Sequence, residues 1–344
     1  MKRLSLLLAL ALGAASVGSA LAQTQSTNQP QSRRQAPPFD PTSPAAHDPV
    51  MAKEGDTYYV FTTGRGVSRL ATKDLKTWEA LPPVFAEPPA WIAEVLPGSR
   101  GSFWAPDIIY HQGKWHLFYA SSAFGKNTSV IGHATSPTLD PQSPNHKWTD
   151  CGMIVQSVPN RDFWNAIDPN VIVDENHTPW MNFGSFWGGM KMMKLTDDMM
   201  AVAKPEVWYT LSRRLRTFEL DDTDPGDGAV EAPFIYKHGK WYYLFVSFDY
   251  CCRGKDSDYK VVVGRAERVE GPYFDKEGKS MNEGGGSIVA QGDGVKWAGV
   301  GHNSAYTIDG RDYFVTHAYD KETGASKLLI RSISWEDEWP VVKL

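Results

Sequence analysis

Short stretches in which apolar and polar residues alternate recur along this chain, and most of them are rich in residues that favour strands. Clear examples lie at residues 57–61, 114–119 and 240–245, where Tyr, Trp, Phe, Val and Leu predominate. A period of two with this composition predicts β-strands. Sustained helical periodicity is hard to find anywhere, so the pattern predicts an all-β fold.

A longer repeat organises these strands. Five apolar stretches each follow one polar residue, and a proline stands close to that residue in four of them. The polar lead residues are separated by 59, 61, 63 and 71 positions; they are Asp48, Asp107, Asp168, Glu231 and His302. A turn and an aromatic strand follow each lead stretch. Units of this length that contain several strands predict a five-bladed β-propeller over residues 45–344.

The alternative is an ordinary β-sandwich, in which the X-Pro pairs would simply begin edge strands. In a propeller, the innermost strand of each blade lines a central channel, and the starts of these strands lie at one end of it. The five lead residues would then converge although they are far apart in sequence. We therefore treat them as one candidate site.

The first 22 residues have the features of a secretory signal peptide. A basic start, Met1-Lys2-Arg3, precedes an apolar run from Leu4 to Val17, and Ser19-Ala20-Leu21-Ala22 provides an A-x-A cleavage site. The alternative, a membrane anchor, is disfavoured because the apolar run is short for a spanning helix. Residues 23–44 are rich in Gln, Ser and Pro and predict a disordered linker. These features predict a secreted or periplasmic protein.

Charge and cysteine content narrow the function classes. The formal charge is −5, and it would become −7 once Lys2 and Arg3 were removed, which argues against a nucleic-acid partner. Beyond the first 22 residues, no stretch is apolar enough to cross a membrane. The cysteines are Cys151, Cys251 and Cys252, without the CxxC spacing of a zinc site. The adjacent pair is either a vicinal disulfide or two buried thiols.

The acidic lead residues suit one kind of chemistry. Hydrolysis of a glycosidic bond requires one carboxyl group that protonates the leaving oxygen and another that activates water or attacks directly. Glu231 lies between Val230 and Ala232, which favours a group that keeps its proton; Asp48, beside His47, favours an ionised base. Asp168 would lie between them and raise the proton affinity of the acid. For Asp107, a structural role stays open.

Sugars also need flat apolar surfaces. Five aromatic residues lie beside the lead residues or just after blade strands, although packing between blades is the alternative for each; they are Trp104, Phe124, Trp164, Phe186 and Trp187. His302 could bind a metal, orient a carboxylate or be structural. Four aspartates at 221–227 lack the spacing of an EF-hand and predict a solvated loop, at the rim of a cleft.

Several phrases of the sequence occur together in one known family. They are His47-Asp48-Pro49, Trp104-Ala105-Pro106-Asp107, Asn165-Ala166-Ile167-Asp168-Pro169, Gly184-Ser185-Phe186-Trp187-Gly188-Gly189, Val230-Glu231-Ala232-Pro233, Cys251-Cys252 and Gly301-His302-Asn303. In these phrases the chain resembles glycoside hydrolase family 43, and within it the endo-1,5-α-L-arabinanases, over residues 45–344. One late phrase, residues 315–320, is looser than the pattern of the family.

The resemblance implies a five-bladed propeller and an inverting hydrolase. It makes Asp48 the general base, Glu231 the general acid and Asp168 the residue that tunes and orients the acid. It also implies one calcium ion, held by His302 and mostly by water. The residues expected to bind substrate are Trp104, Phe124, Trp164, Asn165, Ser185 and Trp187.

The predicted function is therefore a secreted, inverting enzyme that cleaves α-1,5-L-arabinofuranosidic bonds, with arabinan or arabino-oligosaccharides as substrate and endo cutting expected. We expect a monomer. The alternatives are an exo-arabinanase, a β-xylosidase or an α-L-arabinofuranosidase on the same fold, and a carbohydrate-binding propeller without catalysis. The loops at 85–102 and 210–229 look individual, and they leave the choice between endo and exo cutting open.

Overall fold

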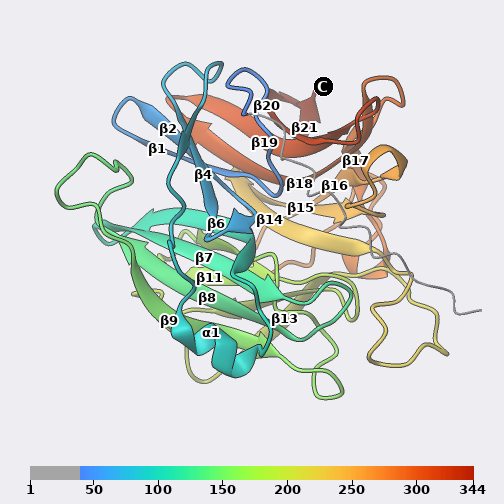
Figure 1. Ribbon diagram of the computed structural model, residues 1–344. Helices are drawn as coiled ribbons and strands as arrows, with labels where there is room; N and C mark the ends of the chain where they lie inside the picture. The colour runs from blue at the N-terminus through green and yellow to red at the C-terminus, as the bar shows by residue number, and fades with distance from the viewer. Residues whose placement is uncertain (1–38) are drawn as a thin grey trace, which may run out of the picture. The chain divides into compact units, whose positions relative to one another are not determined.

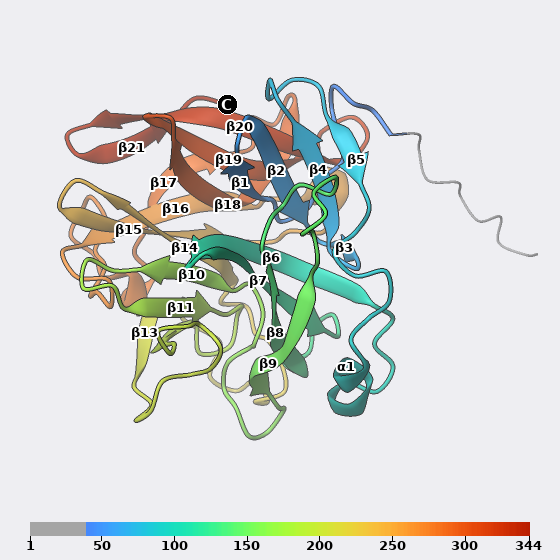
Figure 2. The same ribbon diagram turned by 90° about the vertical axis from the view of Figure 1, so that its left-hand side faces the viewer.

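The computed structural model describes residues 39–344. The predicted signal peptide and residues 23–38 of the predicted linker lie outside the described residues. In the described part, the strands form five antiparallel sheets in chain order, which are the blades of a propeller (Figures 1 and 2). The predicted all-β, five-bladed fold is confirmed. No described helix is long and apolar enough to cross a bilayer.

Each blade is a meander of four main strands. The first two blades contain β1 (Val50–Glu54), β2 (Thr57–Thr62), β4 (Ser68–Thr72) and β5 (Glu79–Leu81), then β6 (Ser102–His111), β7 (Lys114–Ser122), β8 (Ser129–Ser136) and β9 (Thr149–Ser157). The third and fourth contain β10 (Asn170–Val173), β11 (Pro179–Phe183), β12 (Met190–Lys194) and β13 (Trp208–Ser212), then β14 (Val230–His238), β15 (Trp241–Phe248), β16 (Lys260–Ala266) and β17 (Ser287–Gln291). The fifth contains β18 (Trp297–Ile308), β19 (Arg311–Asp320), β20 (Ser326–Glu336) and β21 (Trp339–Val342).

The remaining elements are short. They are β3 (Gly64–Arg65), which pairs with β6, the helix α1 (Ala90–Val95), and the 3-10 helices at Gly254–Asp256 and Met281–Glu283. None of them changes the order of the blades.

Alternation along a blade strand separates two cores rather than a core from solvent. In β15, Leu244 and Val246 pack in the cluster shared with the third blade, whereas Tyr243 and Phe245 pack in the cluster shared with the fifth. Successive side chains of a strand point to opposite faces of its sheet, and each face of this blade is covered by a neighbouring blade. This explains why the aromatic strands read as nearly continuous apolar runs.

The first and last blades lie side by side and close the ring (Figures 1 and 2). Ala45 forms an antiparallel bridge with Lys327 of β20, and the carbonyl oxygen of Pro44 accepts a hydrogen bond from the amide of Leu328 at 3.1 Å. The last residues of the predicted linker therefore contact the fifth blade.

Each innermost strand contains, or closely follows, one residue in the left-handed backbone conformation that faces the channel. The φ angles are 53° at Asp48, 39° at Ala105, 57° at Asp168, 56° at Ala232 and 51° at His302. Residues other than glycine seldom adopt this conformation, and where they do the surrounding structure must hold them. Five such residues at matching places define the ring of strand starts that faces the channel.

The structure differs here from the predicted repeat. In the second and fourth blades the left-handed residue is an alanine, so Asp107 lies two residues after it and Glu231 one residue before it. The pairing register shifts at these points, between Trp104 and Asp107 and between Glu231 and Phe234. Such bulges redirect side chains. The five polar residues therefore do not occupy equivalent positions.

Asp107 has a structural role that the sequence left open. Its Oδ2 accepts a hydrogen bond from the backbone amide of Val171 in the third blade at 2.6 Å. Asn170, at the matching position of the third blade, repeats this link, because its Oδ1 accepts a hydrogen bond from the amide of Ile235 at 2.9 Å. Side chains two residues after the left-handed position thus join one blade to the next.

Replacing Asp107 with alanine is expected to lower the free energy of unfolding by about 1–3 kcal/mol, because the amide of Val171 loses its buried acceptor. D107N keeps an acceptor and should be tolerated. Burial raises the pKa of Asp107 to about 7 in the folded protein, from 3.8. The folded form therefore binds this proton more tightly, and the stability that it contributes at acid pH is lost as pH rises through 7.

Urea unfolding at pH 5 and pH 8 tests both statements. D107N should show a smaller loss of stability between the two pH values than the wild type. An unchanged free energy of unfolding in D107A would contradict the structural role.

Candidate active site

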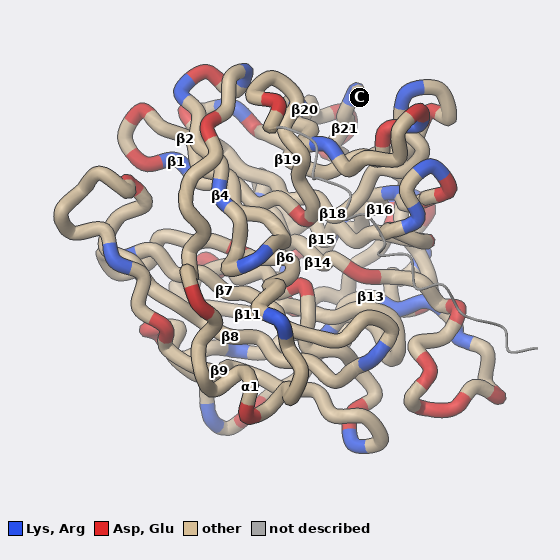
Figure 3. Tube along the Cα trace, in the orientation of Figure 1, with Lys and Arg blue, Asp and Glu red and all other residues tan. Residues whose placement is uncertain are grey.

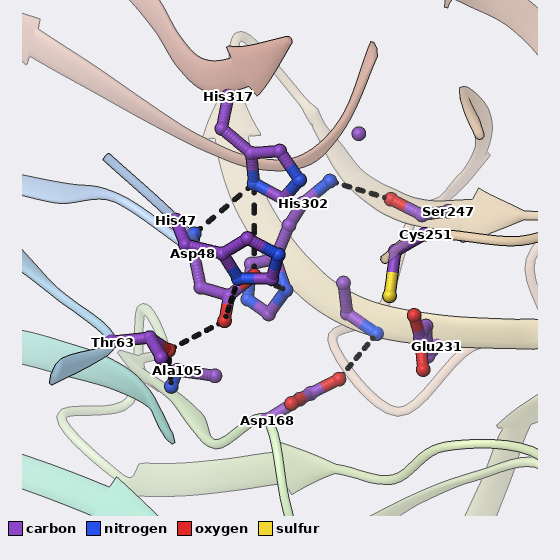
Figure 4. A network of polar contacts seen from close by, with 12 residues as sticks. His47, Asp48, Thr63, Ala105, Asp168, Glu231, Ser247, Cys251, His302 and His317 are labelled. Carbon is purple, nitrogen blue, oxygen red and sulfur yellow. Dashed lines mark hydrogen bonds and ion pairs between the residues drawn. The ribbon is translucent and has the colours of Figure 1, made fainter. Parts of the chain in front are cut away.

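A cavity of about 590 Å³ lies at the starts of the innermost strands. It is lined by nine of the ten predicted site residues: Asp48, Trp104, Phe124, Asn165, Asp168, Ser185, Trp187, Glu231 and His302. The tenth, Trp164, is not on its wall. Figure 4 shows Asp48, Asp168 and Glu231 around a common space.

A larger cavity, of about 790 Å³, lies at the other ends of the same strands. Among the described residues that line it, Asp107 is the only buried carboxyl group, and that group is occupied with backbone hydrogen bonds. Glycosidic hydrolysis needs two carboxyl groups. The smaller cavity is therefore the candidate active site.

Asp48 is held as a carboxylate by its neighbours. Its Oδ1 lies 3.0 Å from Nδ1 of His302, and its Oδ2 lies 2.8 Å from Nδ1 of His47. The hydroxyl of Thr63 donates a hydrogen bond to Oδ2 at 2.5 Å. Burial would raise the pKa of Asp48, but the charge of His302 and the hydrogen bonds of His302 and His47 hold it well below its usual range. An ionised group of this kind suits a base.

Glu231 has the opposite character. Burial raises the pKa of Glu231, and hydrogen bonds from Ser185 and Tyr259 offset part of that rise. The hydroxyl of Ser185 donates to Oε2 at 2.7 Å, and the hydroxyl of Tyr259 donates to Oε1 at 2.9 Å. A carboxyl group that keeps its proton toward neutral pH suits a general acid.

Asp168 supports the segment that carries the acid. Its Oδ2 accepts a hydrogen bond from the amide of Ala232, the residue after Glu231, at 3.1 Å. Burial raises the pKa of Asp168 well above its usual range, His302 lowers it in part, and the charges of Glu231 and Asp48 raise it further. The cavity thus combines one ionised carboxylate with two groups that favour the protonated form.

Residues 40–340 of the chain match the family model described as Glycosyl hydrolases family 43. The chain belongs to glycosyl hydrolase family 43. It is therefore a glycosidase, and the resemblance seen in the sequence is confirmed.

Individual family 43 proteins are similar over most of the chain. The extracellular exo-α-(1→5)-L-arabinofuranosidase ArbA of Cellvibrio japonicus is 48% identical, and the extracellular endo-α-(1→5)-L-arabinanase 1 of Bacillus subtilis is 39% identical, each over 86% of both chains. Among solved structures, an α-L-arabinanase of Cellvibrio cellulosa complexed with arabinohexaose has a TM-score of 0.86 and 47% identity, covering 88% of this chain and 96% of that one. An endo-arabinanase of Bacillus licheniformis has a TM-score of 0.78 and 38% identity, covering 88% and 98%.

The aromatic residues on the cavity wall differ in exposure. Phe124 is 79% exposed, which is high for a large apolar side chain, whereas Trp187 is buried. Trp164 lies elsewhere, because its ring packs against Phe183 and Trp208 at centroid distances of 5.5 and 5.2 Å. In this structure Trp164 is part of the packing of the third blade, the alternative that the sequence had left open.

The acidic segment at 221–227 belongs to the rim of the cavity, since Pro225 and Gly226 line it. Acidic residues gather on the loop between β13 and β14 (Figure 3). Arg216 lies inside the loop and donates to the carbonyl oxygen of Asp224 at 2.9 Å. The indole Nε1 of Trp187 donates to the carbonyl oxygen of Asp222 at 3.0 Å. Arg216 thus holds the loop together through hydrogen bonds to its backbone carbonyl oxygens.

Four further residues lie close to Asp48 or Glu231, and no sequence pattern pointed to them: Thr63, Tyr259, His317 and Tyr319. Thr63 follows β2, Tyr259 precedes β16, and the other two belong to β19. His317 is fully buried, and its Nδ1 accepts a hydrogen bond from the amide of Asp48 at 3.1 Å. The one available signal was that residues 315–320 deviate from the pattern of the family.

Cys251 and Cys252 form a vicinal disulfide on the cavity wall, whereas Cys151 is free. Of the two alternatives that the sequence left open, a disulfide or two buried thiols, the structure has the disulfide.

The predicted calcium ion can be compared with the donors present. Ca²⁺ prefers six to eight oxygen ligands. In the described residues, the clusters of three potential ligands near the cavity contain His47, Asp48 and His317 or His47, Cys251 and Cys252, but not His302. His302 therefore offers a single imidazole, which fits only an ion held mainly by water.

Replacing Tyr259 with phenylalanine is expected to move the alkaline limb of the kcat/KM profile to higher pH. The hydroxyl of Tyr259 favours the ionised form of Glu231, so its loss raises the pKa of the acid further, and the active protonated form persists to higher pH. Y273F is the matched control, because the buried hydroxyl of Tyr273 donates to the carbonyl oxygen of Val269 instead. A limb that stays in place or moves to lower pH in Y259F would contradict the assignment of Glu231 as the acid.

Proposed function

We propose that this protein hydrolyses α-1,5-linked L-arabinofuranosyl bonds of arabinan with inversion at the anomeric carbon. The observation that carries the proposal is the opposite character of two carboxyl groups on one cavity: the pKa of Asp48 is lowered and the pKa of Glu231 is raised. Relatives named arabinanases, and an arabinanase solved with arabinohexaose, support the choice of polymer.

In this reaction Glu231 donates its proton to the glycosidic oxygen as the bond to the anomeric carbon breaks. Asp48 takes a proton from a water molecule, which attacks that carbon from the opposite face. Asp168 fixes the backbone beside Glu231 through the amide of Ala232. Inverting enzymes keep acid and base about 6.5–9.5 Å apart to admit this water.

We further propose that the enzyme cuts within the chain. Phe124 lines the cavity and yet is 79% exposed, so it offers an apolar surface to sugar units that extend beyond the bond that is cut. Phe218, on the acidic loop at the rim, is also exposed. A polymer lying across the cavity could contact both surfaces.

Exo cutting is the second candidate, and a specific observation favours it. The relative from C. japonicus, at 48% identity, is named an exo-arabinofuranosidase. An exo enzyme would need a barrier at one end of the cavity, and the loop of residues 213–229 is the element available for it.

A time course of products from linear arabinan tests the proposal, with arabinoxylan alongside and E231Q as the inactive control. A ladder of arabino-oligosaccharides early in the reaction is expected for endo cutting. One short product from the start would favour exo cutting. Release from arabinoxylan alone would overturn the substrate, and a product that first appears with the retained anomeric configuration by NMR would overturn inversion.

We expect calcium to bind at His302, with water as most of its ligands. The nearby carboxylates Asp48 and Asp168 raise the pKa of His302 to about 9 against the effect of burial, so a bound cation must displace a proton. When bound, the ion would add positive charge beside Asp48. Calorimetric titration with CaCl₂ should show binding to the wild type with proton release, and no binding to H302A; equal binding to both would contradict this site.

The location of the protein is part of the proposal. Two relatives are named extracellular, and the N-terminal sequence predicts a signal peptide. We therefore propose that the protein is secreted or periplasmic. The monomeric state remains a prediction.

A further inference from the structure

A group of side chains beside Asp48 takes no direct part in the proposed reaction; Figure 4 shows two of its members, His47 and His317, next to Asp48. His47 precedes Asp48, and His317 and Tyr319 come from β19 of the last blade. The vicinal disulfide Cys251–Cys252 lies next to them, in the segment after β15. Three different blades therefore meet at the base.

Close polar contacts connect the disulfide to the base. The backbone amide of Cys252 donates a hydrogen bond to the hydroxyl oxygen of Tyr319 at 2.8 Å. The same hydroxyl lies 2.8 Å from Nε2 of His47. On the other side of that ring, Nδ1 lies 2.8 Å from Oδ2 of Asp48. The chain of contacts runs without a gap from the cavity wall to the carboxylate.

The donors and acceptors in this chain agree in direction. Because the oxygen of Tyr319 already accepts from Cys252, its own proton is free to be donated to Nε2 of His47. The imidazole then carries its proton on Nδ1, where it faces the carboxylate of Asp48. Tyr319 thus selects the tautomer of His47 that supports an ionised base.

A second contact limits the rotation of the same ring. His317 stacks on His47 with ring centroids 4.2 Å apart, and Nδ1 of His317 accepts the amide hydrogen of Asp48. The backbone of Asp48 and the ring of His47 are therefore both held by β19. Movement of Tyr319 or of the ring of His47 would therefore shift the carboxylate of Asp48.

The segment that carries the disulfide is anchored at its start. Asp249 forms ion pairs with Arg214 at 2.7 Å and with Lys260 at 2.6 Å. Farther along, Cys252 has a φ of 65°, a left-handed conformation that its surroundings must maintain. The disulfide ties Cys252 to its neighbour, and the hydrogen bond to Tyr319 ties it to β19. Both cysteines line the cavity that would receive the sugar.

We propose that Tyr319 is a positioning residue that couples the disulfide-bonded wall of the cavity to the base Asp48 through His47. The proposal rests on the function proposed above, in which Asp48 activates water. It predicts that the rate of the chemical step depends on the hydroxyl of Tyr319 and on the intact disulfide. It also predicts that loss of the disulfide has little effect once that hydroxyl is absent.

The test combines Y319F with loss of the disulfide. Steady-state kinetics on linear arabinan would be measured for the wild type, Y319F, C251S/C252S and the triple variant. As a second measurement, folded wild type and Y319F would be treated with a dithiol reductant, which supplies two electrons and two protons to give two thiols. Y236F is the matched control, because the hydroxyl of Tyr236 bonds to Thr307 and Asp312, away from the acids.

The expected result is a fall in kcat of about 10- to 100-fold in Y319F, the size expected when a reacting group is misplaced. KM should stay within about twofold, because no substrate contact is removed. Loss of the disulfide should lower the kcat of the wild type but should have little further effect in Y319F. Y236F should keep the kcat of the wild type.

Three results would overturn the proposal: a wild-type kcat in Y319F, a KM that rises while kcat holds, or the same fractional loss on reduction in Y319F and in the wild type. Failure of the proposed function would be visible separately, as absence of arabino-oligosaccharides from the wild type in the same assay. If C251S/C252S did not fold, the reduction of folded protein would still decide the coupling.

Discussion

Replacing Asp48 with asparagine is expected to lower kcat on linear arabinan by about 10²–10⁴-fold, which is the usual contribution of a positioned base. Asparagine has nearly the same shape but cannot take a proton from water. The contacts from Thr63 and His302 show how much of the surrounding structure keeps this group ionised. Steady-state rates together with thermal unfolding would separate lost chemistry from lost folding.

D107N is the matched control for D48N. Asp107 is also a buried aspartate beside the channel and has a similar place in the sequence repeat, but it bonds to the backbone and lies on the other cavity. It should keep most of the wild-type rate. Activity near that of the wild type in folded D48N would end the assignment of the base.

E231Q is expected to lose activity in a way that depends on the leaving group. On arabinan the departing sugar oxygen needs a proton, so kcat should fall by about 10²–10⁴-fold. On an aryl arabinofuranoside with an acidic phenol, the leaving group departs without that proton, and the loss should be much smaller. Glutamine retains an oxygen that can accept from Ser185, so the local structure should survive.

The two variants together assign the roles. D48N should be impaired on both substrates, because water must be activated in either case. Equal losses on arabinan and on the aryl glycoside in E231Q would show that Glu231 does not protonate the leaving oxygen. The pattern would be reversed if the acid and the base had been exchanged.

The sequence predicted the propeller because each blade repeats the same local signals: a proline near a strand start, a tight turn and an aromatic strand. It predicted the three carboxyl groups because they stand close to those prolines. It did not predict that Asp107 and Glu231 are out of phase with Asp48, Asp168 and His302. Alignment of Pro49, Pro106, Pro169 and Pro233, instead of the polar residues, would have revealed the offset.

The residues that support the carboxyl groups could not be predicted from the sequence, for a physical reason. Tyr259, His317 and Tyr319 come from outside the innermost strands, and their pattern is that of core residues. Only the packing of one blade against the next decides which buried side chain meets a carboxylate. Trp164 shows the converse: it precedes Asn165 directly, yet it lies in a bend of the chain, and its ring joins the core of the third blade.

A ring of five similar blades has no built-in direction for a polymer laid across it. The two alanines among the left-handed positions, Ala105 and Ala232, interrupt that symmetry, and the acid stands on the fourth blade while the base stands on the first. An arabinan chain threaded the other way round would offer its leaving oxygen to Asp48, which has no proton to give. The placement of the acid on one blade and the base on another therefore allows an arabinan chain to be cut in only one of its two orientations across the ring.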